Sequence, residues 1–130
     1  MILDSSALIS LICREQGYGR LLAAMESAPD VAIGAPTLAQ VDAVIVARLG
    51  LCGRAVLSLF LERSRTRVIA FDDDHRKVAA SASIRYGKGR HPAALSVGDC
   101  MAYATAHLAD SSLLAVGRRF PLTDLPLATA

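Results

Sequence analysis

The sequence predicts an α/β protein with a mainly parallel sheet and helices on both faces of that sheet. Short apolar runs, which are typical of buried parallel strands, alternate along the whole chain with longer segments of helical periodicity. The 130 residues, of which 53% are hydrophobic and 5 are proline, have the length and composition of one globular domain. We therefore expect a single domain over residues 1–130 with a sheet of four to five strands.

The first half of the chain contains two predicted strands and three predicted helices. Residues 1–3 are too few for a surface strand but suit a buried parallel one, so Asp4 falls where that strand ends and a helix begins. The next elements are expected at residues 5–13 (helix), 18–27 (helix), 31–33 (strand) and 37–49 (helix). The helix over 37–49 is apolar almost all round, which predicts burial on most of its sides.

A fourth helix is expected over residues 52–64, with Val56, Leu59 and Phe60 facing inward. A strand over 67–71 follows it, and the three acids after that strand, residues 72–74, are expected to favour the N-terminal dipole of the next helix.

That next helix is predicted to begin near His75 and to end at Tyr86, and residues 87–92 form a basic, glycine-rich loop. Ser96 is expected to cap the helix that carries Asp99. The rest of the chain is predicted as a strand over 113–116, an irregular segment over 118–123 and a possible fifth strand over 125–127.

Charge and cysteine content narrow the class of protein. The formal net charge of +2 permits a nucleic-acid partner without implying one, because binding depends on whether the 14 basic residues cluster. Cys13, Cys52 and Cys100 are odd in number, lack CxxC spacing and have apolar neighbours, so we expect reduced, buried thiols. The sequence shows no basic leader and no apolar run long enough for a bilayer, which predicts a soluble cytoplasmic protein without membrane association.

Asp4 is the first candidate site residue. It follows a predicted parallel strand, and open α/β sheets bind ligands at the carboxyl ends of such strands. A fully dried carboxylate there costs on the order of several kcal/mol, so it must meet water, hydrogen-bond donors or a cation. The simpler alternative is that Asp4, Ser5 or Ser6 caps the helix that follows.

Asp99 is the second candidate, because it lies on an otherwise apolar stripe of its predicted helix and therefore needs a partner. A cap, or a salt bridge to Arg85, Arg90 or Arg119, would supply one. If Asp4 and Asp99 converge instead, their oxygens suit Mg²⁺ or Mn²⁺, which need only a few protein carboxylates plus water. Such an ion would activate water and neutralise charge on a phosphodiester.

Three stretches together resemble a known family: the opening MILDSSALI, the run YGKGRHPAALSVGDCMAYATA and the ending LLAVGRRFPLTDL. They look like a PIN-domain protein of the VapC type, the ribonuclease toxins of bacterial and archaeal toxin–antitoxin pairs. The similarity covers essentially the whole chain, and the run that contains GDC is its most specific part. The resemblance implies a Rossmann-like three-layer α/β/α domain that often dimerises, Mg²⁺-dependent cleavage of RNA, and inhibition by a cognate antitoxin.

The acidic cluster of that family is carried over only where residues match. Its first acid corresponds to Asp4 and the acid of its GDC run to Asp99, so the resemblance implies that these two bind metal and act in catalysis. Gln40 stands where the family usually has a glutamate, and Arg119 stands where an acid usually precedes phenylalanine. These departures leave one net negative charge, which weakens the attraction for a divalent cation, and Arg119 can serve as an internal counter-ion.

Two further residues, Asp124 and Ser6, are candidates for supporting that site. Asp42 is not a third, because two residues along a helix rotate a side chain by about 200° and it cannot easily replace Gln40. Asp124 is a better candidate, since the family often has an aspartate after a threonine near this point, although capping and surface solvation are alternatives. Ser6 is the other possible supporting residue.

Four basic or titratable residues flank the helix of Asp99, namely Arg85, Lys88, Arg90 and His91. They are candidates for phosphate contacts in an RNA groove, and an ordinary solvated loop explains them equally well. Aromatic residues for base stacking are scarce, so sequence-specific reading of RNA is not indicated.

Two functions follow. The first is a VapC-like toxin, an endoribonuclease with a weakened Mg²⁺ or Mn²⁺ site on Asp4 and Asp99, whose partners are RNA, a cognate antitoxin and a second copy of the chain. The second is a pseudonuclease that binds an antitoxin or RNA without cutting. A phosphoacceptor receiver domain does not fit, because the acids 72–74 follow the third strand and no lone aspartate after a middle strand pairs with a late lysine. Exposed apolar positions on the helices of residues 18–64 are the expected partner surface.

Overall fold

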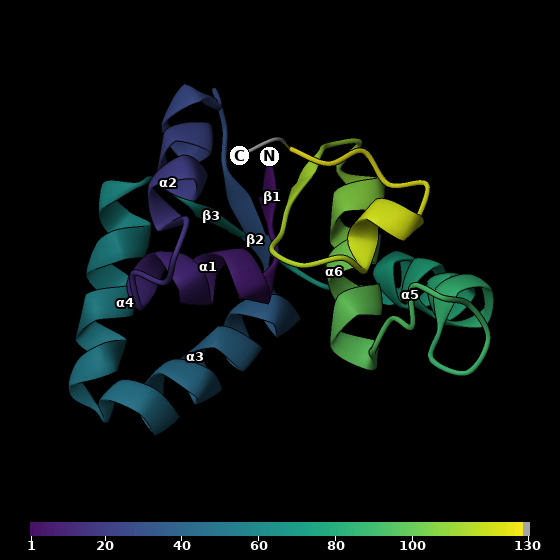
Figure 1. The fold of residues 1–130 in the computed structure, drawn as a ribbon, viewed down its shortest axis with the longest axis horizontal. Coiled ribbons are helices and arrows are strands. Elements are labelled where there is room, and N and C mark those ends of the chain that lie inside the picture. Colours follow the sequence, from purple (N-terminus) through teal and green to yellow (C-terminus); the bar gives the residue numbers. More distant parts are fainter. Residues whose placement is uncertain (129–130) are drawn as a thin grey trace.

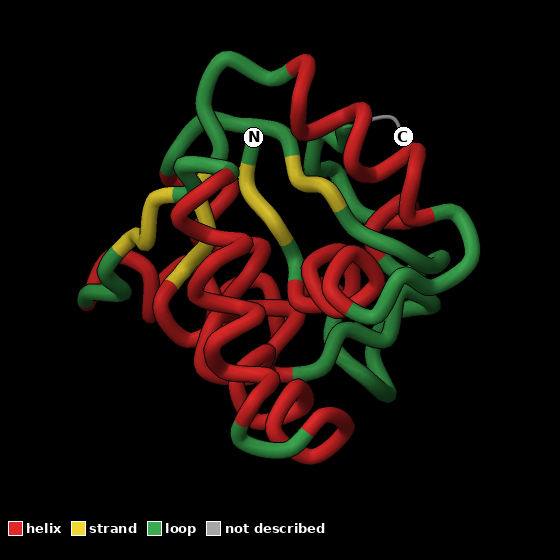
Figure 2. Tube along the Cα trace, turned by 90° about the vertical axis from the view of Figure 1, so that its left-hand side faces the viewer, coloured by secondary structure: helices red, strands yellow, loops and turns green. Residues whose placement is uncertain are grey.

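The computed structural model describes residues 1–128, in which a small parallel sheet lies between two groups of helices (Figure 1). The sheet has the strand order β3-β2-β1-β4, and every neighbouring pair is parallel. Figure 2 shows that the strands are short beside the helices around them. The strands are β1 (Ile2–Leu3), β2 (Ala32–Gly34), β3 (Arg67–Ile69) and β4 (Leu113–Leu114).

Six α-helices and one turn of 3-10 helix surround this sheet. Within residues 1–128 none of them is long and apolar enough to cross a membrane. They are α1 (Ser5–Ile12), α2 (Tyr18–Ser27), α3 (Ala35–Leu49), α4 (Cys52–Arg63), α5 (Asp73–Tyr86), α6 (Val97–Leu108) and η1 (Phe120–Leu122).

The alternation of side chains along the strands divides the core in two. Ile2 of β1 and Leu113 of β4 pack with buried residues of α5 and α6. Their neighbours Leu3 and Leu114 point to the other face and pack with α1, α2, α3 and α4. Figure 1 shows the same division, with α1 to α4 on the left of the sheet and α5 and α6 on the right. The predicted three-layer α/β/α fold is confirmed.

Most predicted elements are present, with small shifts at their ends. The third strand ends at Ile69, short of the predicted residue 71, and the fourth ends at Leu114. The possible fifth strand is reduced to a single parallel bridge between Leu113 and Leu127. Residues 129–130, the end of the predicted domain, lie outside the described residues.

The expected burial of the helix over 37–49 is wrong. Only Thr37, Val41 and Ile45 of α3 are buried, so α3 presents one narrow face to the core. Apolar residues on every side of this helix therefore do not indicate packing against the core on every side. The remaining apolar side chains of α3 lie on partly open surface.

The expected inward face of α4 is correct for Phe60, which is partly buried and packs against the core, but wrong for Val56 and Leu59. Val56 and Leu59 are 48% and 47% exposed, whereas Gly53 and Leu57 are buried. The reason is the packing of α4 on α3: a Cβ on Gly53 would lie 2.6 Å from Cγ2 of Ile45, so the helices approach closely at the glycine. Cys52, predicted as buried, is consequently exposed in the same turn.

The other two cysteines agree better with the prediction. Cys100 is buried on α6 and Cys13 is half-buried after α1, and all three thiols are free. The predicted caps are confirmed as well. The Asp72 side chain accepts from the His75 backbone N–H at 3.1 Å, and Ser96 Oγ accepts from the Asp99 N–H at 3.1 Å.

Candidate active site

Asp4 lies at the carboxyl end of β1, where it caps α1. Only 4% of the residue is exposed. Its Oδ2 accepts hydrogen bonds from the Ser6 backbone N–H at 3.1 Å and from Ser6 Oγ at 2.5 Å. Ser6 Oγ accepts in turn from the Val116 N–H at 3.0 Å, which ties the start of α1 to the segment after β4. Ser6 therefore fixes the orientation of the Asp4 carboxylate.

The charged form of Asp4 is disfavoured where it lies. Burial raises the pKa of Asp4, the hydrogen bonds from Ser6 lower it, and the negative charge of Asp99 raises it again. The result is a pKa above the ordinary value of 3.8. The segment after β4 links the two acids: the Val116 N–H donates to Ser6 Oγ beside Asp4, and Arg119, three residues later, pairs with Asp99.

Asp99 lies in the first turn of α6 and is held by two donors. Its Oδ2 accepts from the Ser96 backbone N–H at 2.9 Å, which completes a capping box. The same oxygen accepts from Nη1 of Arg119 at 2.9 Å. The side chain of Asp99 is 16% exposed and that of Arg119 is 59% exposed. Of the three arginines considered from the sequence, Arg119 is thus the partner of Asp99.

Gln40 reaches this site from α3. A Cβ built on Gly98 would lie 2.1 Å from Nε2 of Gln40, so the amide lies directly against the backbone of the first turn of α6. Gly98 immediately precedes Asp99 and leaves the room that the Gln40 side chain fills. The Gln40 amide therefore packs against α6 one residue before Asp99, and the sequence did not indicate Gly98 as its neighbour.

Asp124 has other partners. Its Oδ1 accepts from Tyr103 Oη at 2.7 Å and its Oδ2 from Arg85 Nη1 at 3.3 Å, and its backbone N–H donates to Tyr86 Oη at 3.1 Å. The hydrogen bond from Tyr103 lowers the pKa of Asp124, whereas burial and the same hydrogen bond raise the pKa of Tyr103. Asp124 thus fastens the C-terminal segment to α5 and α6, and its carboxylate is committed to Tyr103 and Arg85.

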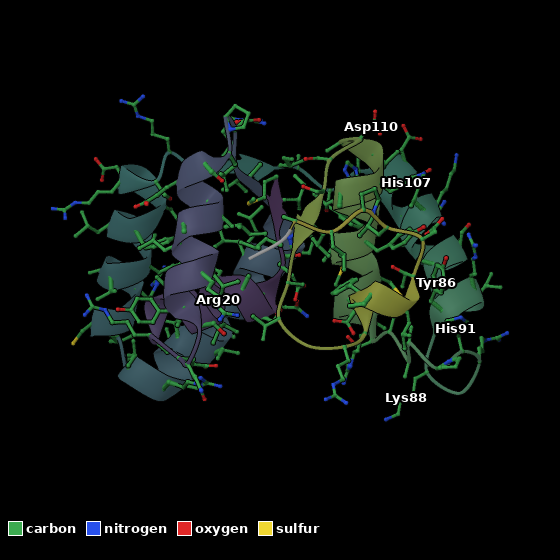
Figure 3. The ribbon with its side chains drawn as sticks, turned by 45° about the horizontal axis from the view of Figure 1, so that its top comes forward. Arg20, Tyr86, Lys88, His91, His107 and Asp110 are labelled. Carbon is green, nitrogen blue, oxygen red and sulfur yellow. The ribbon has the colours of Figure 1, made fainter. Side chains whose placement is uncertain are left out.

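The four residues considered for RNA contacts fall into two pairs. Arg85 lies over the Tyr86 ring, 4.8 Å from its centre, and His91 packs edge-on to the same ring at 5.0 Å. Lys88 and Arg90 are exposed on the loop between α5 and α6. Figure 3 shows Tyr86 and His91 near each other and Lys88 extending away from the ribbon. Within residues 1–128 the side chains of Lys88 and Arg90 form no ion pair or hydrogen bond, whereas Arg85 pairs with Asp124 and His91 accepts from the Ala93 N–H.

The site can be tested for its fit to a divalent cation. Within residues 1–128 the hydrogen bonds to both aspartates go to Oδ2, so Oδ1 of Asp4 and Oδ1 of Asp99 are left for a ligand. No group of three or more His, Cys, Asp or Glu residues that could hold a metal occurs in this described part. Two carboxylates that repel each other fit one Mg²⁺ or Mn²⁺ ion that keeps most of its water. They do not fit a metal enclosed by protein ligands.

Comparison with known proteins assigns the family. The family model described as PIN domain matches residues 1–125. Ribonuclease VapC36 of Mycobacterium tuberculosis is 42% identical over 126 residues, which are 96% of this chain and 91% of that protein.

Two solved structures are similar to the chain in fold. The M. tuberculosis toxin VapC20, described as cleaving the sarcin-ricin loop, has a TM-score of 0.80 at 15% identity and covers 99% of this chain and 98% of its own. A chain of a toxin–antitoxin complex from Klebsiella pneumoniae has a TM-score of 0.66 at 21% identity, with 92% and 88% covered. With the match to the family model and the identity to VapC36, the chain belongs to the PIN-domain family and, within it, to the VapC ribonuclease toxins.

Proposed function

We propose that this chain is a divalent-metal-dependent endoribonuclease that cleaves RNA phosphodiesters at a site built on Asp4 and Asp99. The observation that carries the proposal is the electrostatic state of Asp4, which is 4% exposed and is further destabilised as an anion by the charge of Asp99. Two acids arranged to repel each other at a strand end are unfavourable for the isolated protein. A shared cation makes the same arrangement favourable, and perturbed acids of this kind are typical of functional sites.

The residues of the site have separate tasks in this proposal. Oδ1 of Asp4 and Oδ1 of Asp99 would hold Mg²⁺ or Mn²⁺, while Ser6 keeps the first carboxylate oriented and the Ser96 N–H keeps the second. The bound ion would supply an activated water and offset the charge of the phosphate. The Gln40 amide can accept or donate a hydrogen bond to substrate or water, but it cannot take a proton as a glutamate would.

RNA binding in this proposal depends on phosphate contacts. Lys88 and Arg90 are exposed on the loop that leads to α6, so they can neutralise backbone phosphates of a bound RNA. Contacts of this type position the RNA without reading its bases. Binding should therefore weaken with added salt, and Lys88 and Arg90 should contribute to that salt dependence.

The second candidate function is a pseudonuclease that binds its partners without cleavage. The observation that favours it is the contact between Arg119 Nη1 and Asp99 Oδ2 at 2.9 Å, which gives the site a positive charge of its own. At position 40 a neutral amide stands where the family usually has a glutamate, and this amide lies against Gly98. Both departures reduce the attraction for a divalent ion.

One experiment separates the two functions. RNA cleavage is measured with Mg²⁺ and with Mn²⁺ for the wild type, for Asp4→Asn and for the double variant Gln40→Glu with Arg119→Asp. The nuclease predicts cleavage by the wild type that falls by a factor on the order of 10² or more in Asp4→Asn, the size of effect that follows loss of a group stabilising charge. A silent wild type and an active double variant would establish the pseudonuclease.

The cognate antitoxin is proposed to bind between α2 and α4. A groove of about 730 Å³ lies there, and its apolar lining includes Leu22, Met25, Val56, Leu59 and Phe60. Val56 and Leu59 are close to half exposed, as expected for an apolar surface that a partner covers in a complex. An amphipathic helix is the segment that such a groove fits, because apolar residues one turn apart fill it together.

The antitoxin surface is tested by Leu59→Gln, which should weaken the complex with the cognate antitoxin while RNA cleavage by the free chain is unchanged. Ile84→Gln is the matched control, because Ile84 is 67% exposed on α5, on the opposite side of the sheet. Equal loss of binding in the two variants, or no loss in either, would contradict the placement.

The homodimer implied by the family resemblance stays a prediction. Light scattering on the purified chain during gel filtration would measure its mass in solution. A mass of about twice 13.7 kDa is expected, and a mass of 13.7 kDa at all concentrations would contradict the dimer.

A further inference from the structure

We propose that Arg119 makes metal binding depend on the substrate: it pairs with Asp99 in the free protein and moves to a phosphate of the bound RNA, which releases Asp99 for the divalent cation. RNA and the cation would then favour each other's binding. The inference rests on the proposed nuclease function, and it goes beyond it by assigning a role to a residue that is a departure from the family's acidic cluster.

Asp99 keeps its position without Arg119. The Ser96 N–H donates to Asp99 Oδ2 at 2.9 Å, and Ser96 Oγ accepts from the Asp99 N–H at 3.1 Å. This reciprocal pair belongs to the start of α6 and does not involve the arginine. Departure of the guanidinium therefore leaves a carboxylate that is already oriented.

The backbone that carries Arg119 is held on both sides. Before it, the Val116 N–H donates to Ser6 Oγ at 3.0 Å, and after it Phe120 is buried at 4% exposure. Farther along, Asp124 is fastened to Tyr103. Because the chain is fixed at these points, the movement required is a change of side-chain rotamer at Arg119, with no rearrangement of the fold.

Arg119 is also free to take a second partner. Its side chain is 59% exposed, and within residues 1–128 only Nη1 takes part in an ion pair. The remaining donors suit a phosphate, to which a guanidinium binds through two parallel hydrogen bonds. An ion pair as exposed as the one with Asp99 is weakened by solvent, so a phosphodiester can compete for the arginine.

The charge of the site changes when Arg119 moves. With Arg119 in place, one of the two negative charges is offset by a cation belonging to the protein. When the guanidinium turns to a phosphate, Asp4 and Asp99 together present both charges, and the phosphate adds another. The attraction for Mg²⁺ or Mn²⁺ then increases at the moment when substrate is present. By linkage, the cation tightens phosphate binding by the same factor.

The test measures the dissociation constant of Mn²⁺ on the full chain by the electron paramagnetic resonance signal of free Mn²⁺. It is made with and without a short single-stranded oligodeoxynucleotide, which supplies phosphodiesters and whose integrity is checked on a gel. The same measurement with Asp4→Asn protein and the oligonucleotide gives the Mn²⁺ that the oligonucleotide itself holds, and this amount is subtracted. Arg118→Gln is the charge-matched control for Arg119→Gln, because Arg118 is an exposed neighbour without an ion pair in residues 1–128.

The proposal predicts that the oligonucleotide tightens Mn²⁺ binding to the wild type and to Arg118→Gln by about fivefold or more, a typical size for coupling between two sites. Arg119→Gln should bind Mn²⁺ more tightly than Arg118→Gln without the oligonucleotide, and should respond little when it is added. If the two variants bind Mn²⁺ alike and respond alike, the role of Arg119 is overturned while the nuclease proposal stands. If no protein binds Mn²⁺ under either condition, the metal site itself is overturned, and the inference with it.

Discussion

The two aspartates of the site begin their helices in different ways. Asp4 is itself the N-cap of α1, and only 4% of the residue is exposed. Asp99 is three residues past the cap of α6, where Ser96 does the capping and Arg119 supplies a counter-charge. Within residues 1–128, Asp4 is thus buried without an ion pair, and Asp99 is paired with the exposed Arg119.

In the proposed site, this difference indicates that Asp4 would need the metal more than Asp99 would. The hydrogen bonds from Ser6 offset part of the cost of burying Asp4, but the pKa is still raised, so the carboxylate is not fully compensated by the protein. Asp99 has its compensation in Arg119 and the Ser96 N–H. We therefore expect different variants at Asp4 to separate the effect of its charge from the effect of its cap. Substitutions around Asp99 should act mainly on the stability of α6 and on binding of the cation.

The largest effect should come from comparing Asp4→Ala with Asp4→Asn. Asparagine keeps an oxygen that accepts from the Ser6 N–H, whereas alanine removes the cap and leaves Ser6 Oγ without its acceptor. Loss of an N-cap costs about 0.5–2 kcal/mol, so the alanine variant should be less stable than the asparagine variant by about that amount. Urea denaturation of both variants measures it. Equal free energies of unfolding would show that the cap seen at Asp4 does not stabilise α1.

A somewhat smaller effect is expected on the other helix, from Ser96→Ala. The substitution removes the acceptor for the Asp99 N–H and should lower the free energy of unfolding by about 1 kcal/mol. Ser81→Ala, at an exposed position within α5, is the matched control and should change little. A loss at residue 81 as large as that at residue 96 would mean that capping is not the cause.

The pH dependence of stability sharpens the comparison further. Because the pKa of Asp4 is raised in the folded protein, the folded state binds more protons than the unfolded state between 3.8 and the raised pKa. The stability that protonated Asp4 contributes is present below that interval and is lost as the pH rises through it. Asp4→Asn should not lose it, so its melting temperature should exceed that of the wild type more at neutral pH than below pH 3.8. A constant difference across this range would contradict the burial of a charged Asp4.

The sequence was sufficient for the fold because its signals are local. Short apolar runs locate the strands, and Ser96 and Asp72 identify the starts of their helices by capping chemistry. The rotation of α4 was not predictable in the same way. Val56 and Leu59 are apolar, but the close approach of Gly53 to Ile45 decides which side faces the core, and that depends on a partner helix.

The site was predictable only in part, for the same reason. Asp4 and Asp99 could be found from their places at a strand end and on an apolar helix stripe, and Arg119 was one of three arginines that could pair with Asp99. The packing of Gln40 against Gly98 joins α3 to α6 and has no local signal. The commitment of Asp124 to Tyr103 likewise depends on how the C-terminal segment folds back over α6.

The most direct test of the shared cation site is anomalous diffraction from a crystal of the wild-type chain soaked in Mn²⁺. The account predicts one anomalous peak bound by Oδ1 of Asp4 and Oδ1 of Asp99, with the other positions of its coordination shell taken by water. Well-ordered density for both carboxylates with no peak between them at saturating Mn²⁺, or a peak at other residues alone, would contradict it.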